Sequence, residues 1–284
     1  MKILVTGAAG FIGAHCTLRL LGEGHRVVGV DNFNDYYSPA LKEARVEWVR
    51  ELAGDFPLLR LDLADASSTT DMFAEVQPDV VIHLAAQAGV RYSLDHPRAY
   101  TSSNIDGFLN ILEGCRANPV RHLLYASSSS VYGANQQTPY SVHDNVDHPL
   151  SLYAATKKAN ELMAHAYSHL FGIPCTGLRF FTVYGPWGRP DMSPVQFARA
   201  ISAGQPLQLF NHGQHQRDFT YIDDIVEGLV RLIDCPPSPN PAWDRDHPDP
   251  SSSMAPWQVL NIGGQSPVEL LEYVATLEKH LGRQ

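Results

Sequence analysis

The chain has 284 residues, of which 44% are hydrophobic and 18% charged, and its formal net charge is −9. This composition is ordinary for a globular protein with one substantial core, or one core and a smaller lobe. The acidic balance and the lack of a Lys/Arg cluster argue against a nucleic-acid partner. No apolar run approaches the roughly 20 residues of a membrane helix. Lys2 leads directly into a short apolar run without a secretory signal pattern, so we expect a cytoplasmic protein without a membrane partner.

Short, β-branched apolar runs alternate with longer helical segments in the first half of the chain. Strands are predicted over residues 3–6, 26–30, 58–61, 80–84, 122–126 and 175–180. Helices are predicted over residues 11–21, 67–76, 103–118 and 152–171. This rhythm is typical of right-handed crossovers, and it predicts an α/β fold with a Rossmann-type, doubly wound parallel sheet.

The second half of the chain has a different texture, with frequent glycine, proline and aromatic residues after position 180. Residues 235–256 are rich in Pro, Ser and Asp and predict an exposed loop, with strand-like segments at 219–222 and 259–262 on either side. We therefore predict a dinucleotide-binding domain over residues 1–178 and a smaller substrate-binding lobe over residues 179–284. Segments 218–234 and 257–263 are expected to return to the first domain.

Three glycines follow the first predicted strand and open the first predicted helix, at Gly7, Gly10 and Gly13. In a dinucleotide-binding turn, such glycines permit the tight turn, the approach of the backbone to the pyrophosphate, and close packing of helix on sheet. An ordinary strand-to-helix turn is the alternative. Asp31 ends the second strand, where a carboxylate would bind the ribose hydroxyls and repel a 2′-phosphate, so NAD is favoured over NADP. Asp62 ends the third strand and either caps the adenine edge or serves as a turn residue.

Tyr153 and Lys157 lie four residues apart, which places a phenol and an ammonium on one face of a helix. A tyrosine pKa near 10 is too high for a base at neutral pH, and a nearby cation lowers it by stabilising the phenolate. The pair indicates proton abstraction from a hydroxyl beside NAD. Serines at 127–130 follow the strand predicted over 122–126, at the sheet edge where such folds place active sites. One serine can hydrogen-bond the reacting hydroxyl, and at least two are expected to be loop residues.

The four cysteines and thirteen histidines carry no further catalytic pattern. The cysteines lie far apart without a C-x-x-C pair, so we interpret them as reduced structural thiols. The histidines show no H-E-x-x-H or comparable spacing. We therefore predict no catalytic metal.

Together these residues resemble the extended short-chain dehydrogenase/reductase family over almost the whole chain, and most closely its UDP-glucuronate 4-epimerases. The runs that carry the resemblance are AAQAGVRYS (85–93), YASSSSVYG (125–133), SLYAATKKANE (151–161), RFFTVYGPWGRPDM (179–192) and QRDFTYIDD (216–224). Such long ordered runs are far more specific than the glycine turn. The resemblance implies an NAD-dependent enzyme that acts on a UDP-sugar.

The same resemblance assigns the site residues. Tyr153 is then the base, Lys157 its electrostatic partner, and Ser128 the hydroxyl that steadies O4 of the sugar. Residues on the cofactor side are Gly7, Gly10, Phe11, Ile12, Gly13, Asp31, Asn32, Asp62, Leu63, Ala85, Ala86 and Asn104, together with Tyr153 and Lys157. Residues on the substrate side are Gln87, Arg91, Ser128, Ser129, Ser130, Thr182, Arg189 and Arg217.

Three of these substrate-side residues have specific roles by resemblance. Arg217 would clamp the UDP diphosphate, because a guanidinium fork suits phosphate oxygens. Thr182 and Arg189 would hold the uronate carboxylate. A salt bridge that anchors the loop is the alternative for Arg189.

The relatives all begin by oxidising C4 of the sugar, and residues 129–130 distinguish the later steps of their reactions. Dehydratases that resemble this chain carry Asp-Glu where Ser129 and Ser130 stand, and UDP-glucuronate decarboxylases tend to carry Glu at the position of Ser130. The 4-keto uronate is a β-keto acid that loses CO₂ readily, so an epimerase must hold its carboxylate out of alignment with the carbonyl. The resemblance therefore implies conversion of UDP-glucuronate to UDP-galacturonate.

Three other functions remain open at this point. They are UDP-glucose 4-epimerase, which needs no carboxylate clamp, UDP-glucuronate decarboxylase, and an NAD-binding protein without activity, which the intact Tyr153 and Lys157 disfavour. Relatives usually continue for several tens of residues past the position of Gln284, in a tail that completes the uridine side. We therefore expect a tail to be absent from this sequence. Relatives commonly form homodimers, which here would use the helices predicted over 103–118 and 152–171.

Overall fold

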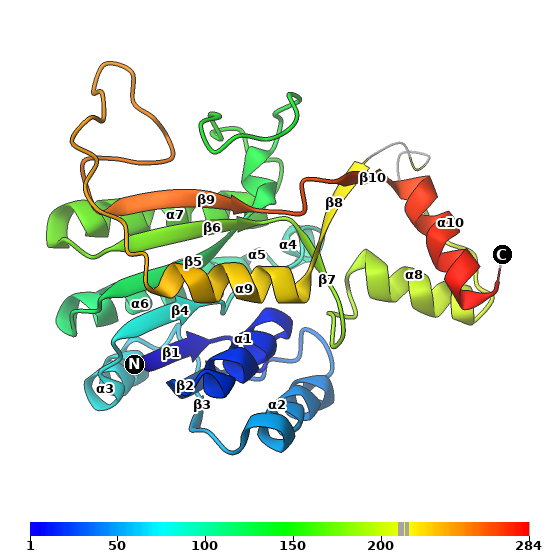
Figure 1. Cartoon of the computed structure of the whole chain (residues 1–284), viewed down its shortest axis with the longest axis horizontal. Coiled ribbons are helices and arrows are strands. Elements are labelled where there is room, and N and C mark those ends of the chain that lie inside the picture. Colours follow the sequence, from blue (N-terminus) through cyan, green and yellow to red (C-terminus); the bar gives the residue numbers. More distant parts are fainter. Residues whose placement is uncertain (210–212, 214–215, 284) are drawn as a thin grey trace.

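Seven parallel strands form the central sheet of the computed structural model, which describes residues 1–209, 213 and 216–283 (Figure 1). The sheet has the strand order β3-β2-β1-β4-β5-β6-β9, and each neighbouring pair is parallel. Its strands are β1 (Lys2–Thr6), β2 (Arg26–Asp31), β3 (Leu58–Arg60), β4 (Val80–His83), β5 (His122–Ser128), β6 (Cys175–Phe180) and β9 (Trp257–Ile262). The predicted doubly wound parallel sheet is confirmed.

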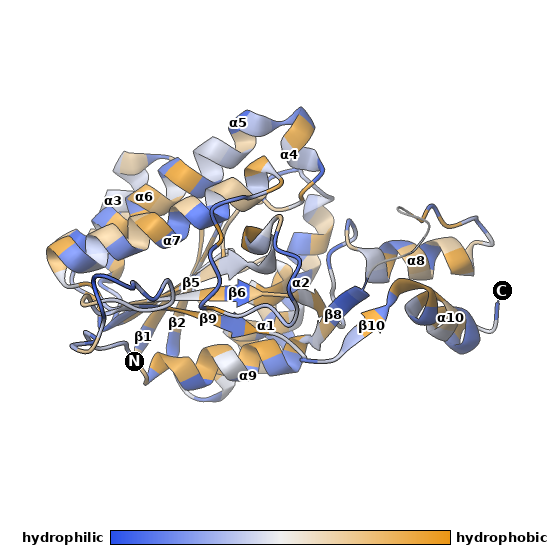
Figure 2. Cartoon of the chain, turned by 90° about the horizontal axis from the view of Figure 1, so that it is seen from above, coloured by the Kyte–Doolittle hydropathy of each residue, from blue (hydrophilic) through white to orange (hydrophobic). Residues whose placement is uncertain are grey.

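Helices cover both faces of this sheet, as the view from above shows (Figure 2). One layer contains α1 (Phe11–Gly22), α2 (Pro39–Ala53) and α9 (Ile222–Ile233), and the other contains α3 (Ala66–Val76), α6 (Gly107–Ala117) and α7 (Leu152–Phe171). Alternate side chains of one strand enter different cores: Ile3 and Val5 pack with α1 and α9, whereas Leu4 packs with α3 and α6. This alternation follows from the period of two in a β-strand, and it explains why the strands are apolar throughout.

Several elements differ from the prediction. Helix α2 was not predicted, although Val46 and Val49 are buried at helical spacing. The strand expected at 219–222 is β8 (Gln216–Tyr221), and α9 begins at Ile222 because the apolar residues after it recur every three to four positions. The helix expected from residue 103 is preceded by α4 (Tyr92–Asp95), α5 (Pro97–Tyr100) and a π-helical turn (Thr101–Asp106) that leads directly into α6.

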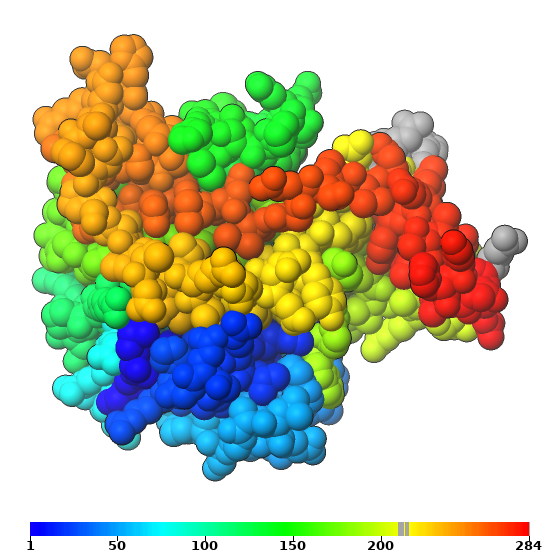
Figure 3. Space-filling model, viewed as in Figure 1, coloured from blue at the N-terminus to red at the C-terminus, as the bar shows by residue number. Residues whose placement is uncertain are grey.

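The C-terminal part of the chain forms a second, smaller sheet with the order β10-β8-β7. Strand β7 (Thr182–Tyr184) runs parallel to β8, and β10 (Pro267–Glu269) runs antiparallel to it. Helices α8 (Ser193–Ser202) and α10 (Leu270–Leu281) pack against each other beside this sheet and stand out from the body of the molecule (Figure 3). The chain reaches β9, in the main sheet, through the loop at 235–256, which also projects from the surface. None of the helices over the described residues is long and apolar enough to cross a membrane.

Candidate active site

A cavity of about 1650 Å³ opens at the carboxyl ends of the central strands, where parallel sheets bind their ligands. A site for one drug-sized molecule has roughly 300–1,000 Å³, so this cavity has room for a dinucleotide and a second ligand. Most of the predicted site residues line it. These are Gly7, Gly10, Phe11, Ile12, Gly13, Asp31, Asn32, Asp62, Leu63, Ala85, Ala86, Gln87, Ser128, Ser129, Ser130, Tyr153, Lys157, Thr182, Arg189 and Arg217.

Two predicted residues lie outside the lining of the cavity. Arg91 is exposed and immediately precedes α4. Asn104 is 1% exposed, and its side chain bonds both the backbone amide and the carbonyl of Gln87, at 2.8 and 3.0 Å. It also donates to Thr156 Oγ1 at 3.0 Å. Asn104 therefore fixes the segment after β4 that carries Gln87 and ties it to α7.

The glycine turn after β1 leaves no space for side chains. Gly7 has a φ of +70°, and a Cβ on Gly13 would lie 2.0 Å from the carbonyl oxygen of Gly7. Gly10 closes the turn by donating from its amide to the same carbonyl at 2.9 Å. Because the turn opens helix α1, its backbone amides and the helix N-terminus face the cavity, as an anionic pyrophosphate requires. The residues present fit a dinucleotide.

The ends of β2 and β3 supply polar groups beside this turn. Asp31 is 7% exposed and accepts hydrogen bonds from the amides of Ala9 (3.2 Å) and Phe33 (2.8 Å). Burial raises the pKa of Asp31, and the ammonium of Lys42, 3.8 Å away, acts in the opposite direction. Asp62 is exposed and accepts from Asn32 at 3.3 Å. Lys42 also lines the cavity and was not identified from sequence, because it lies on the unpredicted helix α2.

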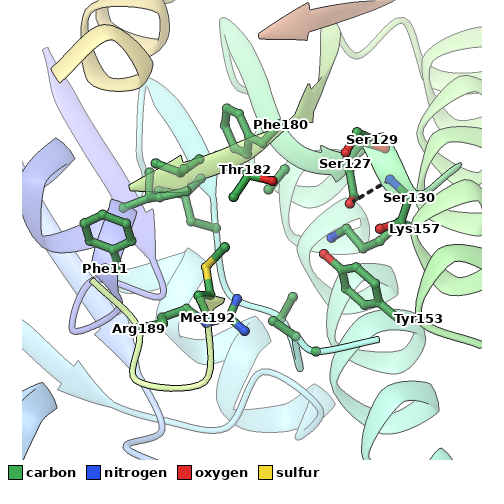
Figure 4. A pocket seen from close by; sticks show the side chains of 18 of the residues that line it. Phe11, Ser127, Ser129, Ser130, Tyr153, Lys157, Phe180, Thr182, Arg189 and Met192 are labelled. Atoms are coloured by element: carbon green, nitrogen blue, oxygen red, sulfur yellow. Dashed lines mark hydrogen bonds between the residues drawn. The ribbon is translucent and has the colours of Figure 1, made fainter. Parts of the chain in front are cut away.

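Tyr153 and Lys157 extend from α7 into the cavity next to the serines that follow β5 (Figure 4). Burial raises the pKa of the Tyr153 phenol, while a hydrogen bond with Ser128 and the positive charge of Arg189 act against this rise. Burial lowers the pKa of Lys157 to about 8, against the influence of the Glu161 carboxylate. Lys157 is 2% exposed, and its ammonium has no hydrogen-bond partner among the described residues. A buried donor of this kind fits a ligand that brings hydroxyl groups.

A buried ion pair lies beneath these residues, and sequence reasoning missed it. Arg179 on β6 and Glu161 on α7 are 0% and 1% exposed, and two hydrogen bonds of 2.9 and 3.0 Å join them. Ser127, immediately before Ser128, donates to the same carboxylate at 2.6 Å. The only signal available was the position of Glu161, one helical turn after Lys157.

The loop after β7 brings Arg189 and Met192 into the cavity, on the side opposite the Tyr153 helix (Figure 4). The guanidinium of Arg189 forms two hydrogen bonds with Asp191, one of them of 3.0 Å from Nε. Tyr36 donates to the same carboxylate at 2.9 Å. The salt bridge considered as the alternative for Arg189 is thus present, while the guanidinium still lines the cavity and its charge acts on Tyr153.

The remaining substrate-side residues come from other elements. Thr182 begins β7, and Arg217 lies on β8, where it is exposed and donates to the Gln216 carbonyl at 3.1 Å. Ser129 and Ser130 form the start of a short 3₁₀ turn, in which the amide of Ser130 donates to Ser128 Oγ at 3.1 Å. Neither position offers a carboxylate for acid–base chemistry. No group of three His, Cys, Asp or Glu side chains among the described residues is placed to hold a metal ion.

The model of the NAD dependent epimerase/dehydratase family matches residues 3–241. The chain belongs to this family. Among similar proteins with curated names, the protein CapI of Staphylococcus aureus is 56% identical, over 100% of this chain and 84% of its own length. A probable UDP-glucuronate 4-epimerase of Rhizobium meliloti is 49% identical, over 100% of this chain and 83% of its own length.

A solved structure is also similar. The crystal structure of UDP-glucuronic acid 4-epimerase from Bacillus cereus, in complex with UDP-glucuronic acid and NAD, matches with a TM-score of 0.84 at 35% identity. The match covers 100% of this chain and 84% of that chain.

Proposed function

We propose that this chain is an NAD-dependent UDP-glucuronate 4-epimerase, which interconverts UDP-glucuronate and UDP-galacturonate. The observation that carries the proposal is that Tyr153, Ser128 and Arg189 share one cavity with the glycine turn. A base, a hydroxyl and a cation for a carboxylate therefore face the same space as the dinucleotide site. Proteins similar to this chain carry the same name, including the Rhizobium protein and the Bacillus enzyme with both ligands.

The side chains of α7 and β5 account for the proton transfer. Tyr153 takes the proton from O4 of the sugar and later returns it, while Ser128 holds that oxygen through its hydroxyl. The Lys157 ammonium, close to its titration point because burial lowers its pKa to about 8, stabilises the phenolate. Bound NAD supplies a reversible acceptor for the C4 hydride. NAD binds at the glycine turn, with Asp31, Asn32 and Asp62 on the adenosine side.

Two features favour epimerisation over loss of water or CO₂. The residues after Ser128 are Ser129 and Ser130, which cannot act as the acid and base of a dehydratase. Arg189 and Thr182 line the cavity from β7 and the loop after it, and they hold the uronate carboxylate there. Holding the carboxylate keeps its C–C bond out of alignment with the C4 carbonyl while the sugar turns over. Arg217 on β8 binds the diphosphate, so segment 179–284 supplies much of the substrate side.

Incubation of the NAD-loaded protein with UDP-glucuronate tests the proposal directly. We expect chromatography to show UDP-galacturonate at equilibrium with the substrate, faster turnover of UDP-glucuronate than of UDP-glucose, and little UDP-4-keto-pentose. The matched control is Tyr153→Phe, which removes only the hydroxyl. Turnover of UDP-glucose alone, or release of the pentose as the main product, would contradict the proposal and identify the other two activities.

We further propose that the protein forms a homodimer through α6 and α7, which pack side by side. Their outer surface exposes Leu109, Leu162, Leu170 and Phe171, and the side chains of Leu162 and Leu170 are 59% and 67% exposed. Leu162 and Leu170 lie eight residues apart and therefore on one face of the helix. Light scattering should give a dimer that Leu162→Lys dissociates, and a monomer for the unchanged protein would disprove this. All four cysteines are free thiols, which supports a proposed cytoplasmic location that cell fractionation can test.

A further inference from the structure

Arg45 on α2 is a fully buried cation whose surroundings are neutral. Its side chain is 0% exposed, and its hydrogen bonds go to backbone carbonyls and to the hydroxyl of Tyr37, at 2.7 Å. Among the described residues, no carboxylate forms an ion pair or hydrogen bond with it. Burial of a charge without a direct counter-ion is costly, so an apolar side chain would fill this position more cheaply. Arg45 therefore has a role that its hydrogen bonds should reveal.

One side of the guanidinium holds the backbone of the loop that carries Arg189. Nε and Nη2 of Arg45 donate to the carbonyl of Trp187 at 3.0 and 2.7 Å, and Nη2 reaches the carbonyl of Gly188 at 3.4 Å. These carbonyls lie two and one residues before Arg189. Trp187 has a φ of +62°, a left-handed conformation that is strained for a residue with a side chain. Such a conformation persists where surrounding contacts hold it, and Arg45 supplies the contacts to the carbonyl.

Two further side chains hold the same loop against α1 and α2. His15 on α1 hydrogen-bonds the carbonyl of Pro186 through Nε2 at 3.0 Å. The rings of Trp48, on α2, and Trp187 lie 5.8 Å apart, and His15 packs on Trp48 at 4.8 Å. The loop of the substrate clamp is thus anchored on helices that belong to the dinucleotide-binding half.

The other side of the guanidinium reaches the glycine turn. Nη1 of Arg45 donates to the carbonyl of Ala9 at 3.3 Å, between Gly7 and Gly10. We propose that Arg45 is a specificity-determining positioning residue, which links the dinucleotide-binding turn to the loop of Arg189 and fixes the carboxylate clamp. This inference rests on the proposed function, because it assumes that Arg189 binds the uronate carboxylate.

The two ends of Arg189 are then held separately. Asp191, supported by Tyr36, holds the guanidinium, and Arg45 holds the backbone from which Arg189 extends. A planar guanidinium bonds Trp187 and Ala9 together, whereas the single ammonium of a lysine cannot present donors in both directions. Once Arg45 is lost, the loop can shift, and the carboxylate of the 4-keto sugar can rotate into the alignment that releases CO₂. The expected consequence is a change in the product, separate from any change in cofactor binding.

The experiment uses the NAD-loaded protein with Arg45→Met and Arg45→Lys, and with Arg50→Met as the control. Arg50 lies on the same helix, but it is partly exposed and pairs with Glu47 and Asp55. We expect Arg45→Met to lower kcat/KM for UDP-glucuronate by about tenfold to a hundredfold, the range for a misplaced positioning group. The share of UDP-4-keto-pentose should rise in Arg45→Met and less in Arg45→Lys, while NAD content and the Arg50→Met partition stay unchanged. Combined with Arg189→Ala, Arg45→Met should add no further pentose.

Each other outcome counts against the inference in a defined way. An unchanged product partition in a folded Arg45→Met protein overturns it, and so does pentose release that is fully additive with Arg189→Ala. Loss of NAD with an unchanged partition would assign Arg45 to the cofactor site alone. If both Arg45 variants fail to fold, Trp187→Gly removes the anchor from the loop side, and a wild-type partition there overturns the inference. If the unchanged protein does not act on UDP-glucuronate, the proposed function itself fails.

Discussion

Glu161 is the single carboxylate that joins the buried groups beneath the active site. It accepts two hydrogen bonds from Arg179 and one from Ser127, and its charge also acts on Lys157. In Glu161→Gln, the Arg179 guanidinium stays buried at 0% exposure without its counter-ion. Removing one partner of a buried ion pair typically costs about 3–5 kcal/mol, a large part of the roughly 5–15 kcal/mol that stabilises a folded protein.

This cost can be measured as a loss of the free energy of unfolding. In a domain of this size each kcal/mol lowers Tm by about 2–4 °C, so Glu161→Gln should lower it by on the order of 10 °C. The exposed pair Glu43–Arg60 is the matched control, because Glu43→Gln should cost less than about 1 kcal/mol. Replacing both partners, as in Glu161→Gln with Arg179→Met, should restore part of the loss because no unpaired charge then remains buried.

Glu161→Gln should also change the pH dependence of turnover. The charge of Glu161 raises the pKa of Lys157, which burial lowers to about 8. Without Glu161 that pKa falls further, so the alkaline limb of kcat/KM should move to lower pH. The reasoning is refuted if Glu161→Gln costs less than about 1 kcal/mol, or if the double variant is as unstable as the two single losses added together.

Three further perturbations test the site. Tyr153→Phe should lower kcat by about 10²–10⁴-fold, the usual contribution of a general base, while bound NAD measured after denaturation stays constant; retained turnover would assign the base elsewhere. Gly13→Ala places a methyl group 2.0 Å from the Gly7 carbonyl oxygen, so the purified variant should contain little NAD and its Tm should not rise on adding it. Lys157→Met should stabilise the NAD-free protein by about 3 kcal/mol at pH 7, because the folded pKa of about 8 lies below the unfolded value of 10.5. This gain is complete below pH 8 and disappears as the pH rises to 10.5, so equal urea midpoints for both proteins at pH 7 would show that the Lys157 ammonium is not destabilised by burial.

The features that the sequence by itself determined are those encoded over a few neighbouring residues. The period of two in β1 and β4 and the helical period of α1 and α7 give the alternating order of a doubly wound sheet. The glycine turn is local because its three glycines crowd around one carbonyl within seven residues. Tyr153 and Lys157 are local as well, since four residues make one helical turn.

The tertiary structure alone decided the contacts that hold these groups in place. Arg179 reaches Glu161 across 18 residues, Tyr36 reaches Asp191 across 155, and Arg45 reaches Trp187 across 142. No pattern in a short window reports such pairings, because they form only when the crossovers bring separate segments to one edge of the sheet. The sequence therefore determined which groups perform the chemistry, and folding decided which buried charges position them.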